Sequence, residues 1–250
     1  MTQDLFRQDA YLRECNACVL AIGPQGIVLD RTVFYPLGGG QAGDSGWLVL
    51  PDGSELPIAD TRKGKDAEGQ FTRDICHLPA PDAQSAGSKL KVGDAVTARV
   101  DWDRRHRLMR FHTTTHLLCH LVPQLVNGCS ITPDYARLDF NMTDPLDKDQ
   151  LTAGIARLVA AGLPITVGSI SDDELDASPA LIKSMSVQPP RGTGRVRTIR
   201  IGEQDLIDYQ PCGGTHVANT SEIGAVVVTK IEKKSATTRR VVLGFTPAGT

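Results

Sequence analysis

The 250-residue sequence has no long apolar run, and a chain without one offers no candidate for a membrane-spanning helix. Its first residues lack the basic and apolar lead-in of a secretory signal, so we expect no export. It has no internal repeat. The composition, 40% hydrophobic and 22% charged residues, is typical of a globular protein that works in water. The length allows one large domain or two modest ones.

Cysteine is sparse, and its spacing suggests no disulfide framework. Six cysteines are scattered along the chain, and only Cys15 and Cys18 form a C-x-x-C pattern, without a second such pair. We interpret these two as buried thiols at the start of a strand. Cysteine usage of this kind is typical of a reducing compartment, so we predict a cytoplasmic protein.

The chain also lacks a strong charge of one sign, because its formal net charge is −2 at pH 7. Residues 1–98 carry 9 basic and 13 acidic side chains, whereas residues 99–250 carry 18 and 16. The second part is therefore slightly basic, with a net charge of +2. This bias permits a phosphate-bearing partner but does not require one, and a solvated surface of mixed charge explains it equally well.

Two histidines four residues apart, His112 and His116, lie in the clearest helical segment of the sequence, Asp101–Leu121. On a helix they share one face and lie one turn apart, so both imidazoles can reach one metal ion. His120 continues the same stripe by a further turn and is a rival ligand. A zinc protease helix reads His-Glu-x-x-His, with the glutamate as general base. Thr113 occupies that place here, which disfavours peptidase chemistry of this type.

A second segment, Cys212-Gly213-Gly214-Thr215-His216, offers a thiolate and a third imidazole beside glycines that allow a tight turn. A set of one cysteine and three histidines is softer than a calcium or magnesium site and suits zinc. We therefore predict one Zn²⁺ per chain, with the ligands His112, His116, Cys212 and His216.

Residues 1–98 contain short β-rich runs separated by glycine, proline and Asp-Gly turns, a pattern that indicates a small β-barrel. The runs are Ala17–Leu20, Gly26–Leu29, Trp47–Leu50 and Ala95–Val100. The glycine-rich stretch Phe34–Gly46 lies among them and is either an ordinary flexible loop or a packed hinge or substrate-facing wall. Residues 79–91 look like an exposed connection.

Helical and strand patterns alternate in residues 99–250. We predict helices at Asp101–Leu121, capped by Asp103, and at Leu146–Ala161, with Asp147 near its start. Ile131–Phe140 reads as a turn into a strand with alternating faces, and further strands are expected at Ile165–Ile170, Arg195–Ile201, Ala225–Ile231 and Arg239–Phe245. The prediction is thus an α+β fold, with a β-barrel domain at 1–98 and a zinc-containing domain at 99–250.

Several stretches, taken in order, resemble the editing domain of alanyl-tRNA synthetases. They are His112–Leu118, Arg137–Phe140, Cys212–Val217 and Ile223-Gly224. The resemblance is closest to the free-standing AlaX proteins, which are distantly related to the editing domain of threonyl-tRNA synthetases. Phe34–Gly46 looks like the glycine-rich motif of the longer AlaX forms, so the likeness covers nearly the whole chain. It implies a small N-terminal β-barrel followed by a two-layer α/β editing domain of the alanyl/threonyl type.

The resemblance implies a zinc-dependent aminoacyl-tRNA hydrolase that deacylates mischarged tRNA(Ala). The expected substrate is mainly Ser-tRNA(Ala), with Gly-tRNA(Ala) as a second candidate. The chain has no room for an aminoacylation domain, so we expect it to edit in trans. The expected partner is the acceptor end of the tRNA, and no obligate protein partner is visible.

The resemblance also implies further site residues. Those expected to bind substrate are Gly38, Gly39, Gly40, Gln41, Arg137, Gly213, Gly214 and Thr215. The catalytic candidates are Thr114, Ser130 and Asp139. The candidate partners of the serine hydroxyl are Thr113, Thr114, Thr115, Thr215 and Ser130, and we choose Thr114 because it shares the helix of the two histidines. Ser130 ends an Asn-Gly-Cys-Ser sequence where the synthetases usually have Gln-Lys-Gly-Ser. Asp139 or Asp208 is expected to orient a ligand imidazole. Arg137 and the Arg195–Arg200 strand are candidates for the terminal phosphates of the tRNA.

An editing site of this kind has to distinguish tRNA charged with serine from tRNA charged with alanine. An apolar pocket rejects an added hydroxyl only by about 10²-fold, whereas a site that hydrogen-bonds the hydroxyl discriminates by about 10⁴-fold. Zinc catalysis requires an open coordination position, while four protein ligands normally form a closed structural site. One ligand can be loose, the metal can become five-coordinate, or zinc can only orient the substrate.

Two other functions compete with this interpretation. The alternative from a different class is a non-catalytic tRNA-binding module with a structural zinc. A zinc hydrolase of a small amide or nucleobase has less support, because the chain lacks the His-x-Glu and Pro-Cys-x-x-Cys patterns of deaminases.

Overall fold

The structure, a computed structural model, describes residues 1–83, 90–189 and 194–246. The chain divides into two compact units. The first contains Met1–Gly38 and Ala42–His106, and the second contains Gly39–Gln41 and Arg107–Thr250. Three residues of the glycine-rich stretch therefore belong to the second unit, although their neighbours in sequence belong to the first. The division of roles between residues 1–98 and 99–250 stays a prediction.

The first unit is built on six antiparallel strands that, within the described residues, close into a barrel in the order β2-β3-β7-β6-β5-β8. The strands are β2 (Glu14–Gly23), β3 (Gly26–Leu29), β5 (Gly46–Val49), β6 (Glu55–Lys65), β7 (Phe71–Pro79) and β8 (Ala95–Val100). A short parallel pair, β1 (Gln3–Asp4) with β4 (Arg31–Thr32), and the 3₁₀ turns Leu5–Arg7 and Pro81–Ala83 complete the unit. Leucine, isoleucine and valine side chains fill its core.

The sequence pattern predicted four of these strands and missed two. β3 and β8 have the predicted bounds, β5 is shifted by one residue, and β2 is longer than predicted. β6 and β7 were missed because the alternation of buried and exposed residues is interrupted: their pairing shifts register between Ile58 and Asp60 and again between Lys63 and Lys65. A bulge of this kind breaks the period of two on which strand prediction depends. Of the connection expected at 79–91, residues 84–89 lie outside the described residues.

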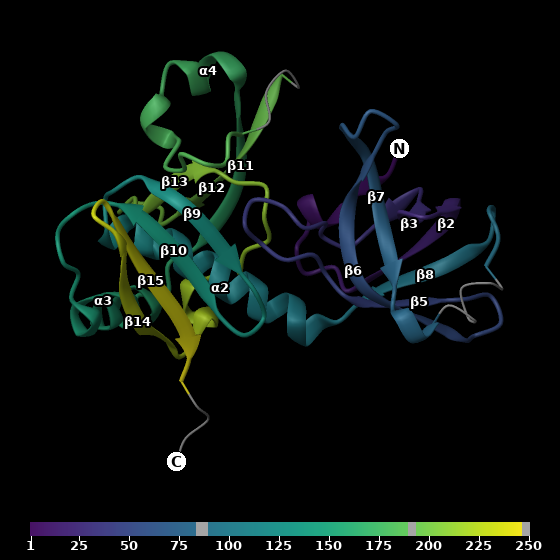
Figure 1. Ribbon diagram of the computed structural model, residues 1–250, viewed down its shortest axis with the longest axis horizontal. Helices are drawn as coiled ribbons and strands as arrows, with labels where there is room; N and C mark the ends of the chain where they lie inside the picture. Colours follow the sequence, from purple (N-terminus) through teal and green to yellow (C-terminus); the bar gives the residue numbers. More distant parts are fainter. Residues whose placement is uncertain (84–89, 190–193, 247–250) are drawn as a thin grey trace. The chain divides into compact units, whose positions relative to one another are not determined.

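The second unit combines helices with two antiparallel sheets (Figure 1). The four-stranded sheet has the order β14-β15-β10-β9, and the three-stranded sheet has the order β11-β12-β13. The strands are β9 (Val126–Ile131), β10 (Ala136–Asn141), β11 (Ile165–Ser171), β12 (Arg195–Ile201), β13 (Asp208–Pro211), β14 (Val226–Ser235) and β15 (Thr238–Phe245). The helices are α2 (Trp102–Leu121), which begins in the first unit and belongs to the second from Arg107 onward, α3 (Lys148–Ala160) and α4 (Asp172–Asp176), with 3₁₀ turns at Pro179–Leu181 and Thr220–Ile223. The predicted mixture of helices and sheets is confirmed.

Helices α2 and α3 pack against the four-stranded sheet. Phe111 of α2 packs against Phe245 of β15, with ring centroids 4.3 Å apart and the rings tilted by 36°, and α3 lies beside β14 (Figure 1). The predicted alternation in β10 is confirmed, because Ala136, Leu138 and Phe140 are buried while the two residues between them are half-buried. These apolar contacts hold the sheet against the helix that carries two of the predicted metal ligands.

Two details of the helices differ from or refine the prediction. The cap of α2 is Asp101 and not Asp103, because the Asp101 carboxylate accepts a hydrogen bond from the Arg104 N–H at 3.1 Å. Asp103 lies inside the first turn. In α3, Asp147 is the N-cap, as its position near the predicted start suggested, and it accepts from the N–H groups of Asp149 and Gln150. Within the described residues, no helix is long and apolar enough to cross a membrane.

Candidate metal centre

Helix α2 places His112 and His116 on one face, as the spacing predicted. Both are almost completely buried, with exposed fractions of 5% and 4%. The loop that follows β13 brings Cys212 and His216 to the same point, and one potential ligand atom from each of the four residues lies within 4.8 Å of the others. The convergence of these four residues agrees with the sequence-based ligand set. His120 is exposed at the end of α2 and lies outside this cluster.

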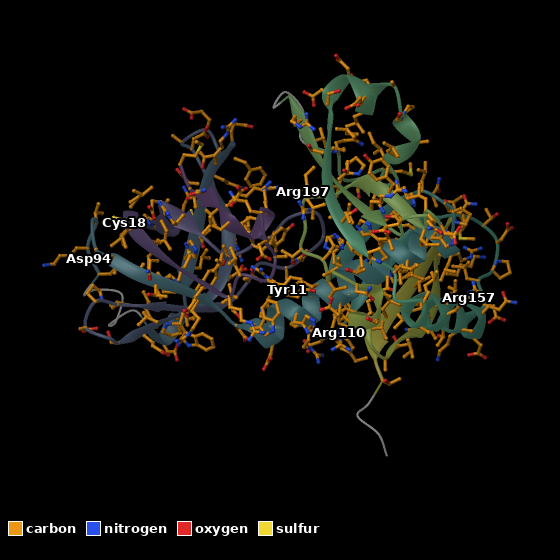
Figure 2. The ribbon with its side chains drawn as sticks, turned by 180° about the vertical axis from the view of Figure 1, so that it is seen from behind. Tyr11, Cys18, Asp94, Arg110, Arg157 and Arg197 are labelled. Carbon is orange, nitrogen blue, oxygen red and sulfur yellow. The ribbon has the colours of Figure 1, made fainter. Side chains whose placement is uncertain are left out.

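The segment with Cys212 is held by the neighbouring strand β12. The Cys212 N–H donates to the Arg197 carbonyl at 3.1 Å. The Arg197 guanidinium, labelled in Figure 2, donates in return to the carbonyls of Cys212 and Gly214 at 2.7 and 3.0 Å. Arg197 thus fixes the backbone of the ligand segment, whereas the sequence suggested it as a phosphate contact. Arg195 and Arg200 of the same strand likewise bond to nearby protein oxygens.

Each ligand imidazole has a partner on its Nδ1 atom. His112 Nδ1 lies 2.7 Å from Gln41 Oε1, His116 Nδ1 lies 2.7 Å from Asp208 Oδ2, and His216 Nδ1 lies 3.2 Å from Thr113 Oγ1. These contacts leave the three Nε2 atoms for a metal. Fixing the second ring nitrogen in this way sets the tautomer and the ring orientation of a metal-binding histidine.

The spacing of the donor atoms fits a tetrahedral metal such as zinc. Cys212 Sγ lies 3.4 Å from His112 Nε2 and 3.3 Å from His216 Nε2. A tetrahedral ion with metal–sulfur and metal–nitrogen bonds of about 2.3 and 2.0 Å separates sulfur from nitrogen by roughly 3.5 Å. One thiolate with three imidazoles is also the type of donor set that zinc prefers. The four residues can therefore bind a metal ion.

The electrostatic environment favours the metal-binding forms of Cys212 and His216. Burial opposes ionisation of the Cys212 thiol, but the nearby imidazoles of His112 and His216 hold its pKa well below the usual value. Burial and the neighbouring His112 lower the pKa of His216 to about 3, which keeps its imidazole neutral. Burial also disfavours a charged His116, yet the hydrogen bonds and charges of Asp208 and Cys212 together outweigh this and raise the pKa of His116 to about 9. A metal ion bound at His116 would therefore displace a proton from this imidazole.

The structure distinguishes the two aspartates that the sequence offered as partners of a ligand imidazole. Asp208 contacts His116, and its other carboxylate oxygen forms an ion pair with Lys183. Asp139 instead receives two hydrogen bonds from Arg240, at 2.7 and 2.8 Å, and one from Arg137 at 3.1 Å. The partner of the imidazole is Asp208. The side chains of Lys183 and Gln210, which both bond to Asp208, carry no signal in the sequence that would have revealed this role.

The three catalytic candidates have the following surroundings. The Thr114 hydroxyl donates to the Arg110 carbonyl of its own helix at 2.8 Å. Ser130 pairs across β9 and β10 with Arg137, so it shares a sheet face with Arg137, whereas its neighbour Cys129 pairs with the buried Leu138. The Asp139 carboxylate is occupied by arginines, as described above. Their catalytic roles stay predictions.

The residues expected to bind substrate fall into two groups. Gln41, Gly214 and Thr215 are packed around His112: Gln41 bonds to His112 and Thr215, and a Cβ atom on Gly214 would lie 2.1 Å from His112 Cε1. The others lie apart from these contacts. Gly38 accepts from the Tyr35 hydroxyl, Gly39 and Gly40 adopt positive φ angles of 58° and 86°, Gly213 is exposed, and Arg137 bonds to Asp139.

Cys15 and Cys18 take no part in this centre. Both residues are half-buried on β2, which is less burial than the predicted buried thiols would have. Cys18, labelled in Figure 2, lies in the first unit. Residues at i and i+3 of a strand point to opposite faces, which explains why this C-x-x-C pair does not form a common binding site.

The sequence is similar to two known protein families and to several characterised proteins. Residues 196–242 match the family described as the threonyl and alanyl tRNA synthetase second additional domain, and residues 8–104 match the family described as class II (A) tRNA synthetases. The alanyl-tRNA editing protein AlaX-M of Saccharolobus solfataricus is 32% identical over 245 residues, covering 96% of this chain and 98% of that protein. AlaX-M of Methanosarcina barkeri is 34% identical, with the same coverage. The alanine–tRNA ligase of Metallosphaera sedula is 34% identical over 241 residues, which are 25% of its length.

The fold and the buried Cys/His₃ cluster thus define a protein of the synthetase editing-domain class. Within that class, the chain belongs to the AlaX family of alanyl-tRNA editing proteins, whose members it matches along nearly their whole length.

Proposed function

We propose that this protein is a zinc-dependent hydrolase that removes the wrong amino acid from mischarged tRNA(Ala), and that it acts in trans. The observation that carries the proposal is the convergence of His112, His116, Cys212 and His216 within 4.8 Å, in a chain that matches AlaX-M proteins over 96% of its length. The relatives carry the name of alanyl-tRNA editing proteins, and editing of aminoacyl-tRNA is the hydrolysis of an ester bond.

The residues of this chain would hold, orient and shield one Zn²⁺. The four ligands supply one thiolate and three imidazoles, while Asp208, Gln41 and Thr113 fix the ring orientations. When bound, zinc supplies Lewis-acid chemistry, because it polarises an ester carbonyl or lowers the pKa of a water. The burial of the ligands excludes bulk water from their ring nitrogens, which strengthens the electrostatic effect of the centre.

The two parts of the chain would have different roles. We assign the barrel in residues 1–98 as the counterpart of the N-terminal barrel of the longer AlaX forms, and residues 99–250 as the two-layer editing domain. The expected partner is the acceptor end of tRNA(Ala), without an obligate protein partner. A cytoplasmic location is supported by the six free cysteines.

Ser-tRNA(Ala) is the proposed main substrate and Gly-tRNA(Ala) the second. A site that hydrogen-bonds the serine hydroxyl leaves its polar partner unpaired when alanine binds, and discrimination of about 10⁴-fold then becomes reachable. Thr114 remains the proposed partner of this hydroxyl, with Ser130 and Asp139 as the other catalytic candidates. Substituting Thr114 by Val tests this, since the variant should lose the preference for serine over alanine without losing zinc.

The decisive experiment measures deacylation of Ser-, Gly- and Ala-tRNA(Ala) by the purified full chain. His116→Ala is expected to reduce hydrolysis of Ser-tRNA(Ala) by more than about 100-fold, because a lost ligand removes more than the 10–100-fold that a lost outer partner does. His120→Ala is the matched control, since this histidine is exposed on the same helix and lies outside the cluster. Circular dichroism and the zinc content of each variant separate loss of metal from loss of fold.

The same experiment tests the alternative function, a non-catalytic tRNA-binding module with a structural zinc. Burial of the three histidine ligands, beside a half-buried Cys212, is the feature that favours this alternative, because catalytic zinc sites keep one position open. The alternative predicts that wild type binds tRNA(Ala) but releases no serine. If a folded, zinc-free His116→Ala protein hydrolyses Ser-tRNA(Ala) as fast as wild type, zinc catalysis is excluded.

A further inference from the structure

Gln41 is a fully buried polar residue, with an exposed fraction of 0%. Its side-chain amide makes three hydrogen bonds. Oε1 lies 2.7 Å from His112 Nδ1 and 3.1 Å from the Thr215 backbone nitrogen, and Nε2 lies 2.9 Å from Thr215 Oγ1. Both partners belong to ligand-bearing segments, since His112 is a candidate ligand and Thr215 precedes the ligand His216. These contacts occupy both polar atoms of the amide.

The backbone fixes which way this amide points. The Thr215 N–H can only donate, so the amide atom that faces it must be the oxygen. The same oxygen faces His112 Nδ1, and His112 must therefore carry its proton on Nδ1 in order to donate. The Nε2 atom of His112 is left with its lone pair, which is the form that binds a metal. Gln41 therefore fixes the tautomer of His112, because the hydrogen bond from the Thr215 backbone N–H fixes the orientation of the Gln41 amide.

The residues around Gln41 are closely packed. A Cβ atom on Gly214 would lie 2.1 Å from His112 Cε1 and 2.8 Å from Gln41 Oε1. On the other side, the Ile131 N–H of β9 donates to the Gly40 carbonyl at 2.7 Å. Gly40 adopts a φ angle of 86°, and a Cβ there would meet Cys129 at 2.9 Å. Glycines thus allow the close approach on both sides of the amide.

We propose that Gln41 is a positioning residue of the metal centre, which orients His112 for metal binding and does not contact the substrate. It is the third member of a set, because Asp208 does the same for His116 and Thr113 for His216. The proposal rests on the metal site of the proposed function but not on the identity of its substrate. It also gives the glycine-rich stretch a different role from the substrate binding that the sequence suggested.

The test compares two substitutions in the full-length protein. Gln41→Met has a similar length but cannot accept from His112, and is expected to lower the affinity for Zn²⁺ by about 10–100-fold, as the loss of an outer hydrogen-bond partner typically does. Gln41→Glu keeps an acceptor for His112 and should remain closer to wild type than Gln41→Met. Leu37→Met is the matched control, because Leu37 precedes the same glycines and is 53% exposed. Affinity is measured by competition with a chelator, and the ligand geometry by the absorption spectrum of the Co²⁺-substituted protein.

A measurement on the wild type avoids any dependence on the folding of variants. In the ¹⁵N-histidine NMR spectrum of the Zn²⁺-loaded protein, His112 is expected to show a proton on Nδ1 and metal coordination through Nε2. Coordination through Nδ1 would overturn the proposal.

The affinity results also separate this proposal from the proposed function. If Gln41→Met binds Zn²⁺ as tightly as wild type with an unchanged Co²⁺ spectrum, Gln41 does not position His112, whatever happens to deacylation. If the Zn²⁺-loaded wild type releases no amino acid from Ser- or Gly-tRNA(Ala), the proposed function fails. The positioning role of Gln41 is then still decided by the metal affinity of the variants and by the His112 NMR spectrum.

Discussion

Asp208 Oδ2 lies 2.7 Å from His116 Nδ1, while Oδ1 of the same carboxylate pairs with Lys183. Asp208 is almost completely buried, and burial by itself raises the pKa of its carboxyl group. The hydrogen bond to His116 and the charges of His116 and Lys183 together lower this pKa by more than burial raises it, so the pKa lies below the usual value. The carboxylate therefore stays ionised beside the ligand imidazole. A negative charge in this position increases the basicity of a metal-binding imidazole.

The Asp208 contact predicts a loss of metal affinity on removal of its charge. Asp208→Asn should weaken Zn²⁺ binding by about 10–100-fold, because an amide orients His116 less firmly and adds no negative charge. Chelator competition measures the effect. Asp139→Asn is the comparison for affinity, since Asp139 pairs with Arg240. Equal affinities of the two variants would show that Asp208 does not support the centre.

The close packing of Gly214 predicts a steric effect on the same centre. Gly214→Ala places a Cβ atom 2.1 Å from His112 Cε1, so either the His112 imidazole or the loop that carries Cys212 and His216 must move. We expect Zn²⁺ affinity to fall by more than about 10-fold, since ligand orientation contributes at least this much. Gly213→Ala, at the exposed neighbouring glycine, should retain wild-type affinity. The prediction is wrong if both alanine variants bind zinc equally well.

The buried His77 predicts acid sensitivity of the barrel. Its exposed fraction is 0%, its Nδ1–H donates to the Ile27 carbonyl, and its Nε2 accepts from Thr32. Burial lowers the pKa of His77 to about 4, whereas an unfolded histidine titrates near 6.5. The unfolded state therefore binds a proton first, and stability is lost as the pH falls from about 6.5 to about 4.

Urea unfolding at pH 7 and pH 5 measures this effect. The free energy of unfolding should fall by about 2 kcal/mol between these pH values through His77 alone. The fluorescence of Trp47 and Trp102, the two tryptophans of the chain, reports on the first unit. His77→Gln should be less stable than wild type at pH 7. Its free energy of unfolding should, however, change less between pH 7 and pH 5, because the contribution of His77 is removed. An unchanged pH dependence in the variant would contradict the assignment.

The buried ion pair of Arg105 and Asp44 predicts a large loss of stability when one partner is removed. Their side chains are 0% and 1% exposed, and Arg105 also donates to the carbonyls of Ala10 and Val33. Asp44→Asn leaves the guanidinium charge buried without its counter-ion, and should lower the free energy of unfolding by about 3–5 kcal/mol. The control is Glu55→Gln, which breaks the exposed pair with Arg99 and should change stability by less than about 1 kcal/mol. Urea unfolding compares the two variants.

Local patterns were sufficient where a single element determines the outcome. Helix α2 has nearly its predicted bounds, and β10 buries the alternate residues that were predicted. The pattern failed at β6, where register shifts interrupt the alternation, and at the cap of α2. Asp101 and Asp103 are the same residue type, so the sequence does not distinguish them as caps. The backbone geometry shows that Asp101 is the cap, because its carboxylate accepts from the Arg104 N–H.

The metal centre shows the same division. His112 and His116 follow from the helical repeat, and the short Cys-x-x-x-His segment supplies the other two ligands. Spacing alone left His120 as a rival and Asp139 as an alternative to Asp208. The folded chain places His120 on the exposed end of α2 and pairs Asp139 with Arg240.

The amino-acid order predicted two local ligand pairs, because a helical turn brings His112 close to His116 and a five-residue segment brings Cys212 close to His216. Only the tertiary structure brings the two pairs to one point and leaves His120 outside it, since Cys212 and His112 are 100 residues apart. The supports of these ligands could not be identified from the amino-acid order. Gln41 is separated from His112 by 71 residues and from Thr215 by 174, and Asp208 from His116 by 92. Contacts over such separations depend on how strands and helices pack, which no local period encodes.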